Sequence, residues 1–177
     1  RDRIRIGGEC IRAGEFALGL SEVRRAAEGA VDAGVVEGLP THFEALALLG
    51  FLHFARERVE LGILEVGLGG RWDCTNIVEP VLSVVTSISE DHEEWLGKGI
   101  RNIAREKAGI FRPSVPALTG ATRPEVLEVL EGVCRSLGAP LGLPGECAVV
   151  RSEDSWRLAA PEGRLEDLPI PALKGEH

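Results

Sequence analysis

Methionine is missing from all 177 residues of the sequence. A natural chain begins with methionine unless it has been processed, whereas this one begins with the charged run Arg1–Arg3. We therefore expect a piece of a longer protein. Long apolar runs are also missing, since none approaches the roughly 18 residues that a membrane-spanning helix needs. The sequence predicts no membrane partner.

A surplus of positive charge is absent as well. The formal net charge is −8, which disfavours nucleic acid and anionic membrane surfaces as the main partner. An anionic small molecule stays compatible with this charge, because local positive groups or a metal ion can hold it.

Cysteine pairs are absent too. No two of the four cysteines have the Cys-x-x-Cys spacing of a zinc or redox site. With no signal peptide at the N-terminus, we expect free thiols in a reducing cytoplasm rather than disulfide bonds. The four are Cys10, Cys74, Cys134 and Cys147.

Two nucleotide-binding signatures are also missing. The sequence has no Gly-x4-Gly-Lys-Ser/Thr motif, which would form a Walker loop. A glycine loop is present at Gly67, Gly69 and Gly70, but Trp72 stands where the dinucleotide fingerprint requires its third glycine. The loop is a weak signal of a phosphate or substrate cradle, and Rossmann-type cofactor binding is not expected.

What the chain does have is an alternation of apolar strands and helices. Two strands are nearly continuous apolar runs, a pattern typical of central parallel strands covered on both faces. The sequence therefore predicts an α/β fold, a doubly wound, mostly parallel sheet with helices on both faces. Residues 139–177 alternate short β-like pieces with Pro and Gly, and we expect them to form a β-rich end of the same domain. The expected elements are a short strand or hairpin at Ile4–Ile11, helices at Glu15–Asp32, Thr41–Val59 and Ile100–Ala108, a helix with a capping box at Thr122–Glu125 that ends at Gly138, a helical turn at His92–Leu96, and strands at Leu61–Val66, Val81–Ile88, Pro116–Thr119, Cys147–Val150 and Ser155–Ala159.

Glu65 lies at the end of one apolar strand, and His92 lies just beyond the end of the other. Ligands bind beyond the carboxyl ends of strands in open α/β sheets, so both side chains are candidates for one site. An ionised carboxylate after a strand of Leu, Ile and Val must be paired, hydrogen-bonded or bound to a cation. The alternatives are a carboxylate that caps nearby loop amides and a surface or capping histidine.

Lys107 is expected on the apolar face of its helix, with Ile100, Ile103 and Ala104. Desolvation drives an ammonium group toward its neutral form. A neutral amine reacts with carbon dioxide to give a carbamate, which turns a cation into an oxygen ligand. The alternative is a lysine whose head group reaches solvent past Ile103.

The run Thr41, His42, Phe43 and Glu44 has two interpretations. Thr41 and Glu44 have the spacing of a capping box, which is sufficient to explain them. Alternatively, His42 and Phe43 stack on a flat heterocycle at the start of the helix.

Together these residues resemble the folylpolyglutamate synthase and dihydrofolate synthase branch of the Mur ligase superfamily. The resemblance covers residues 1 to about 120 well and the rest weakly. The resembling segments are Arg3–Ile6, Thr41–Glu44, Ile63–Arg71 with Asp73, Thr75 and Asn76, then Thr86–Ile88, Asp91-His92, Leu96-Gly97, Ile103-Ala104 and Glu106–Ile110.

The resemblance implies a partial Mur ligase-type central domain over residues 1–177, with the family's phosphate-binding loop upstream and its C-terminal domain absent. The implied activity is ATP-dependent ligation, in which ATP phosphorylates a carboxylate of a pterin substrate and the amine of L-glutamate attacks the acyl phosphate. The implied substrates are dihydropteroate or folate, L-glutamate and ATP, and we expect a cytoplasmic monomer.

The resemblance also implies roles for single residues. Glu65 and His92 would bind Mg²⁺, and Lys107 would carry the carbamate. The pterin would lie against Thr41–Glu44 and against a loop in which Trp72 and Cys74 replace the family's usual Leu and Ala. The three residues of that loop are Trp72, Asp73 and Cys74.

The isolated chain is expected to lack ligase activity and ATP affinity, because the Walker motif supplies most of the phosphate contact in such enzymes. The alternative, from a different class of function, is a non-catalytic Mur-ligase-like remnant that acts as a binding module.

Overall fold

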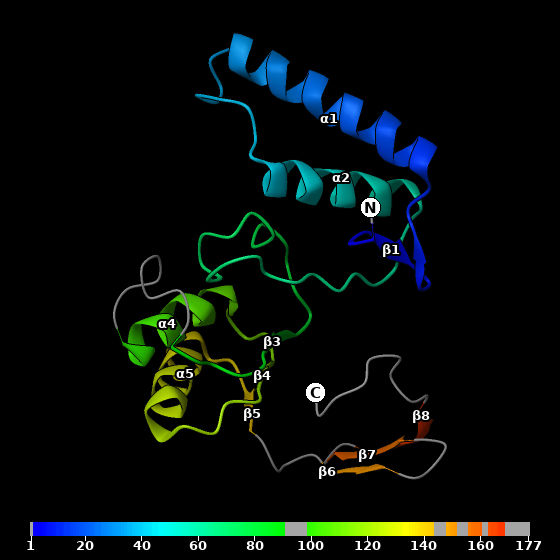
Figure 1. The fold of residues 1–177 in the computed structure, drawn as a ribbon. Coiled ribbons are helices and arrows are strands. Elements are labelled where there is room, and N and C mark those ends of the chain that lie inside the picture. The colour runs from blue at the N-terminus through cyan, green and yellow to red at the C-terminus, as the bar shows by residue number, and fades with distance from the viewer. Residues whose placement is uncertain (1, 91–98, 144–147, 152–155, 161–162, 169–177) are drawn as a thin grey trace. The chain divides into compact units, whose positions relative to one another are not determined.

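The computed structural model describes residues 2–90, 99–143, 148–151, 156–160 and 163–168 (Figure 1). The chain divides into two compact units. The first comprises residues 1–68 and 72–78, and the second comprises residues 69–71 and 79–177.

The first unit is a hairpin followed by two helices. Strands β1 (Arg5–Ile6) and β2 (Glu9–Cys10) pair antiparallel, and the two glycines between them have φ values of 59° and 85°. Positive φ at both central residues is what a tight hairpin turn of this twist requires, so of the two expected alternatives the structure has the hairpin and not a single short strand.

Helices α1 (Ala13–Asp32) and α2 (His42–Arg56) pack side by side in this unit (Figure 1). Both are within three residues of their expected bounds. Gly19 lets the side chain of Leu49 approach the backbone of α1 closely. The buried core of the unit consists of Ile4, Ile11, Val23 and Leu49.

The second unit contains a small parallel sheet. Strands β3 (Ser83–Val85), β4 (Ala117–Thr119) and β5 (Leu141–Gly142) lie in the order β3-β4-β5. The α-helices are α4 (Ile100–Lys107) and α5 (Pro124–Leu137), and the 3-10 helix η1 (Ala108–Ile110) continues α4.

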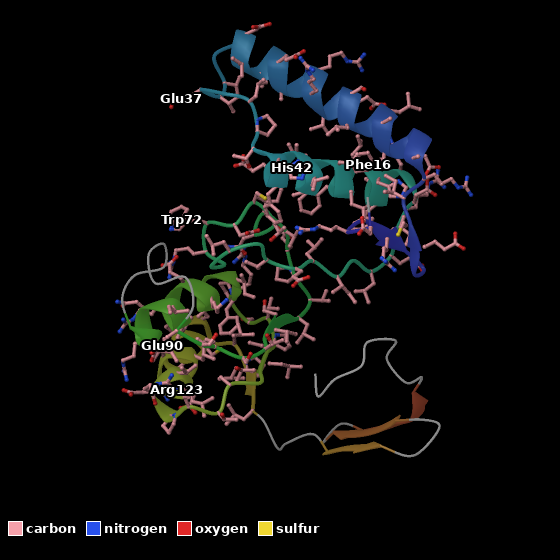
Figure 2. All side chains as sticks on the ribbon, viewed as in Figure 1. Phe16, Glu37, His42, Trp72, Glu90 and Arg123 are labelled. Carbon is pink, nitrogen blue, oxygen red and sulfur yellow. The ribbon has the colours of Figure 1, made fainter. Side chains whose placement is uncertain are left out.

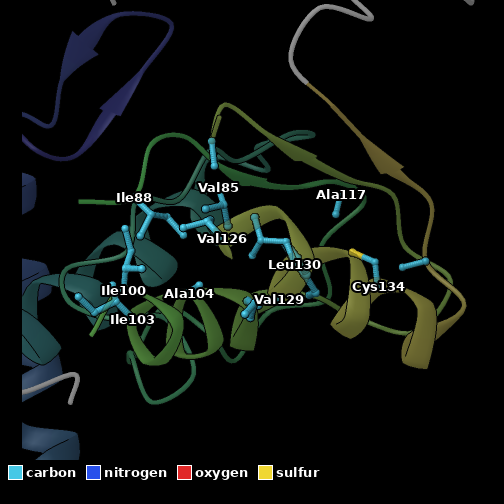
Figure 3. Close-up of a cluster of buried hydrophobic side chains, with 14 residues drawn as sticks. Val85, Ile88, Ile100, Ile103, Ala104, Ala117, Val126, Val129, Leu130 and Cys134 are labelled. Atoms are coloured by element: carbon cyan, nitrogen blue, oxygen red, sulfur yellow. The ribbon is translucent and has the colours of Figure 1, made fainter. Parts of the chain in front are cut away.

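The core of the second unit lies between this sheet and the two helices (Figure 3). Ile103, Val126 and Leu130 are fully buried in it. Pro124 occupies the first turn of α5, and Gly138 ends the helix in the left-handed conformation with φ 60°, as expected from the preference for glycine after a helix.

The α/β class is confirmed, with four α-helices and a three-stranded parallel sheet among the described residues. Within the second unit, the expected helices on both faces of that sheet are not found among the described residues. Ser83 and Val85 are buried, whereas Val84 between them is 49% exposed, and Leu118 in β4 is 40% exposed. Side chains alternate between the two faces of a strand, so the helices of the second unit, α4 and α5, cover one face of this sheet.

The expected strand at Leu61–Val66 is wrong. Residues 62–66 are assigned to no strand and make no backbone hydrogen bond with the described residues. The exposed fractions of Leu61 and Ile63 are 70% and 92%. An apolar run predicts burial, but a strand also needs a neighbour to pair with.

Two other predicted features also change. The strand expected at Val81–Ile88 is only three residues long. The capping box at Thr122–Glu125 is wrong, because Arg123 is the N-cap and its guanidinium group binds the Glu125 carboxylate instead.

The remaining strands form a separate antiparallel sheet in the order β6-β7-β8. Strands β6 (Ala148–Arg151) and β7 (Trp156–Ala160) lie close to the two expected pieces, and β8 (Gly163–Leu168) was not anticipated. His92 and the turn expected at His92–Leu96 lie outside the described residues. In the part of the chain that the structure describes, no helix combines the length and apolar character needed to cross a membrane.

Candidate functional site

An open pocket of about 680 Å³ lies in the first unit, between α2 and the extended segment 63–67. Its wall is mostly apolar, and Phe43 on the first turn of α2 is half-buried against it. Four residues with polar side chains line the pocket: one is basic, two are acidic and one carries a hydroxyl group, namely Arg3, Asp2, Glu65 and Thr75. A mainly apolar pocket with a few polar groups is typical of small-molecule sites.

Glu65 presents an exposed carboxylate to this pocket. It forms no hydrogen bond or ion pair with the residues that the structure describes. The expected alternative, in which Glu65 caps the loop amides, does not hold, because the amides of Gly67 and Leu68 donate to Asp73. The Glu65 oxygens are thus available to a cation.

Asp73 organises the loop that follows. Its Oδ2 accepts hydrogen bonds from the amides of Gly67 at 2.9 Å and Leu68 at 3.1 Å. Its Oδ1 accepts from the Thr75 amide at 2.9 Å and the Thr75 hydroxyl at 2.6 Å. Four acceptor positions are about what one carboxylate offers. The Asp-x-Thr spacing in the sequence predicts the two bonds from Thr75, whereas no local pattern predicts the bonds from Gly67 and Leu68.

These hydrogen bonds set the protonation of Asp73. Burial raises the pKa of this carboxyl group, but the bonds from Thr75, Leu68 and Gly67 together outweigh burial and hold the pKa below its usual 3.8. The group is therefore ionised in the folded chain at neutral pH.

Replacing Asp73 by asparagine is expected to lower the free energy of unfolding at pH 7 by about 1–3 kcal/mol, because an NH2 group replaces one of the two oxygens and the donors at that oxygen lose their acceptor. The folded-state pKa lies below the unfolded value near 3.8, so the contribution of the carboxylate is present above that value and is lost as the pH falls through the folded-state pKa. Urea denaturation across this pH range should therefore show the difference between the two proteins shrinking in acid. Glu79→Gln, which removes an exposed carboxylate outside the loop, is the control. A difference that is constant from neutral to acid pH would contradict this role.

The start of α2 is a complete capping box. The Thr41 hydroxyl accepts from the Glu44 amide at 3.4 Å, and the Thr41 amide donates to Glu44 Oε2 at 2.7 Å. Hydrogen bonds from the backbone and the side chain of Thr41 lower the pKa of Glu44. The capping interpretation of Thr41 and Glu44 is confirmed.

The two residues inside this box face different surroundings. His42 is exposed at the start of α2 (Figure 2), whereas the Phe43 ring lies against Gly67. A Cβ on residue 67 would lie 2.6 Å from Cζ of Phe43, so this contact requires glycine. Phe43 thereby joins α2 to the loop that Asp73 holds.

Replacing Thr41 by alanine is expected to lower the free energy of unfolding by about 1 kcal/mol through loss of the cap. Thr41→Ser keeps the hydroxyl and should cost little. Urea denaturation of the two variants checks the result. Equal losses for alanine and serine would mean that the hydroxyl does not stabilise the helix.

Trp72 and Cys74 flank Asp73. Trp72 is 88% exposed (Figure 2), and its side chain is available for contact with a ligand. Burial, followed by the negative charges of Asp73 and Glu44, raises the pKa of the Cys74 thiol. Cys74 is therefore a neutral, poorly nucleophilic thiol at pH 7. Like Cys10 and Cys134, it is free, as expected.

Lys107 lies in the second unit, at the C-terminal end of α4. Ile100, Ile103 and Ala104 are buried and Lys107 is half-buried, so its expected place on the apolar face is confirmed. Its ammonium group forms no hydrogen bond or ion pair with a described residue. Carbamylation of this amine stays a prediction.

Arg71 has contacts that sequence reasoning missed. Its amide donates to the Glu106 carbonyl at 3.0 Å, and its guanidinium group lies 3.4 Å from Glu106 Oε1. No local pattern links residues so far apart in the sequence. Among the described residues, no three His, Cys, Asp or Glu side chains are gathered as a metal site.

No family model matches the chain. The chain is 36% identical over 173 residues to the Escherichia coli (strain K12) dihydrofolate synthase/folylpolyglutamate synthase, a match that covers 97% of this chain and 39% of that protein. The structure matches E. coli FolC in complex with DHPP and ADP with a TM-score of 0.77 at 34% identity, over 98% of this chain and 40% of that chain. The chain is a partial-length homologue of the folylpolyglutamate synthase/dihydrofolate synthase family.

A second structure of this family, an FPGS-AMPPCP-folate complex, matches with a TM-score of 0.86 at 29% identity, over 96% of this chain and 43% of that chain. These synthase structures hold nucleotides together with DHPP or folate. The chain spans 28% and 39% of the length of the synthases from Bacillus subtilis and E. coli.

Proposed function

We propose that this chain is part of an ATP-dependent ligase that adds L-glutamate to dihydropteroate, to folates, or to both. The observation that carries the proposal is the match to a synthase over 97% of the chain. In this reaction the γ-phosphoryl group of ATP passes to a substrate carboxylate, giving ADP and an acyl phosphate. The glutamate amine then attacks the acyl carbon, forms the amide bond and releases phosphate.

Glu65 is the proposed magnesium ligand, with His92 as a second. The exposed Glu65 carboxylate fits this role, because oxygen is the ligand that Mg²⁺ prefers and the ion retains several water molecules. Bound magnesium would neutralise charge on the transferring phosphoryl group.

Lys107 is proposed to act as a carbamate. Its amine would combine with carbon dioxide and release a proton, which leaves two oxygens at the end of the side chain. Three features support this role: the half-buried position, the buried apolar residues on the same helix face, and the absence of a partner among the described residues.

The proposed pterin contacts are Thr41, His42, Phe43, Glu44, Trp72, Asp73 and Cys74. The exposed Trp72 and the pocket position of Phe43 support a flat aromatic ligand. The four hydrogen bonds on Asp73 indicate that this carboxylate shapes the loop, so its contact with a pterin would replace one of them. We further propose a monomer in a cytoplasmic, reducing environment, consistent with the free thiols.

The test is a chimeric ligase, in which this chain replaces the 173 matching residues of the E. coli synthase. The chimera is expected to form ADP in a reaction that requires both L-glutamate and a pterin substrate. Glu65→Gln should reduce this rate by about 10²-fold or more, the scale of losing a charge-stabilising group, and should weaken its dependence on magnesium. Glu60→Gln, at an exposed position before the segment, is the control.

A chimera that folds and binds pterin without forming ADP would instead favour the binding-module alternative. Glutamate-dependent turnover that is unchanged by Glu65→Gln would remove Glu65 from the site.

A further inference from the structure

The last turn of α4 receives hydrogen bonds from outside the helix. The final carbonyl groups of a helix have no partners within it. Here the Arg71 amide donates to the Glu106 carbonyl at 3.0 Å, and the Arg71 guanidinium group donates to the Arg105 carbonyl at 3.4 Å. A cation is also favourable at the negative end of the helix dipole. Arg71 thus acts as a C-terminal cap that comes from the glycine loop.

Two glycines allow the backbones to meet. A Cβ on residue 70 would lie 2.9 Å from the Glu106 carbonyl oxygen and 3.0 Å from that of Lys107. A Cβ on residue 109 would lie 2.6 Å from Cα of Arg71. A larger residue at position 70 or 109 would push the loop off the helix, so this contact depends on glycine at both positions.

An ion pair completes the attachment. The Arg71 guanidinium Nε lies 3.4 Å from Glu106 Oε1, and the two side chains are 48% and 30% exposed. Ion pairs at this exposure contribute little to stability. The attachment therefore matters more for the position of the neighbouring residue, Lys107, than for stability.

We propose that Arg71 is a positioning residue for Lys107, because it anchors Gly69–Arg71 to the turn of α4 that carries this lysine. The inference rests on the proposed function, in which Lys107 takes part in the reaction. It adds that the glycine loop fixes the lysine through Arg71 and Glu106, and that Gly70 and Gly109 make the fit possible.

The activity test uses the chimeric ligase. Arg71→Gln is expected to lower kcat by about 10- to 100-fold, as small displacements of a reacting group do, while KM for ATP and pterin changes less than about 2-fold. Arg71→Lys should recover part of kcat, because the ammonium group keeps the positive charge but cannot reproduce the separate guanidinium contacts with the Arg105 carbonyl and the Glu106 carboxylate. Arg101→Gln is the matched control, since Arg101 lies on the same helix in an exposed pair with Glu128. A fall in stability with unchanged kcat would overturn the proposal.

A second test needs no activity and uses the 177-residue chain. Lysine is rare in this sequence (Lys98, Lys107 and Lys174), so the Lys107 side-chain NMR signal can be assigned. Arg71→Gln and Glu106→Gln are expected to shift this signal, and Arg101→Gln should leave it in place. Glu106→Gln should also speed hydrogen exchange of the Arg71 amide by about 2- to 5-fold, the factor corresponding to an exposed ion pair.

The two tests separate the two claims. A chimera that is inactive with the unmodified chain refutes the proposed function, while the NMR shifts still report the anchor. A Lys107 signal that is insensitive to Arg71→Gln and Glu106→Gln overturns the anchor even if the chimera is active.

Discussion

Replacing Lys107 by alanine in the chimeric ligase is expected to lower kcat by about 10²- to 10³-fold, the loss typical of removing a group that stabilises charge in the transition state. KM for the pterin should change little, because Lys107 would act on the transferring phosphoryl group. Steady-state kinetics with varied ATP and pterin measures both quantities.

Two controls identify the chemical form of Lys107. Arg105→Ala removes a cation from the same helical turn, where the Arg105 side chain donates to Asn102 Oδ1 at 2.9 Å, and it should leave kcat nearly unchanged. Added formate should partly restore the Lys107→Ala enzyme if a carbamate is the active form, since formate supplies carboxylate oxygens. Rescue by methylamine and not by formate would show that the ammonium group is required.

Replacing Leu130 by alanine is expected to lower the free energy of unfolding of the second unit by about 2–5 kcal/mol, through lost apolar burial and the cavity left behind. Leu130 is fully buried among the residues of α4, α5 and the sheet (Figure 3). Hydrogen exchange of the α5 amides reports this change directly.

The matched control is Leu18→Ala, because Leu18 is 68% exposed on α1. It should change the exchange of α5 amides very little. If both substitutions have the same small effect, the packing of Leu130 in the second unit is not as described.

Local signals predicted the helices well. The Thr41 and Glu44 spacing located the start of α2, and Gly138 located the end of α5. Both depend on residues within one turn of each other, which a sequence displays directly. The capping box expected at Thr122 failed for a local reason too, since the Arg123 side chain pairs with Glu125.

Features that depend on distant partners were not predictable. The apolar run at Leu61–Val66 has the composition of a strand, but composition cannot supply a neighbour. Val84 and Leu118 are apolar, as strands covered on both faces require, yet in the second unit α4 and α5 cover the face opposite to these two side chains. Propensity for strands reflects packing and burial more than any intrinsic backbone preference.

The candidate site likewise has one part that local patterns predicted and one part that depends on distant contacts. The residue types between positions 63 and 110 indicated Glu65 and Lys107 as site residues, and both are accessible in the described structure. His92 lies outside the described residues. The hydrogen bonds of Asp73 to Gly67 and Leu68 were not foreseen, nor was the contact between Arg71 and Glu106. These depend on how the loop folds back and on which helix it meets.

The extended stretch 62–66 also affects how the purified chain behaves in solution. Unpaired backbone groups in an extended run are a template for a strand of another polypeptide, and Leu61 and Ile63 expose most of their apolar surface beside them. Two copies meeting at this stretch would satisfy those backbone groups and cover those side chains at once. Such pairing would compete with the proposed monomer only at high protein concentration, and a charged residue at position 63 is a practical aid to keeping the purified chain monomeric.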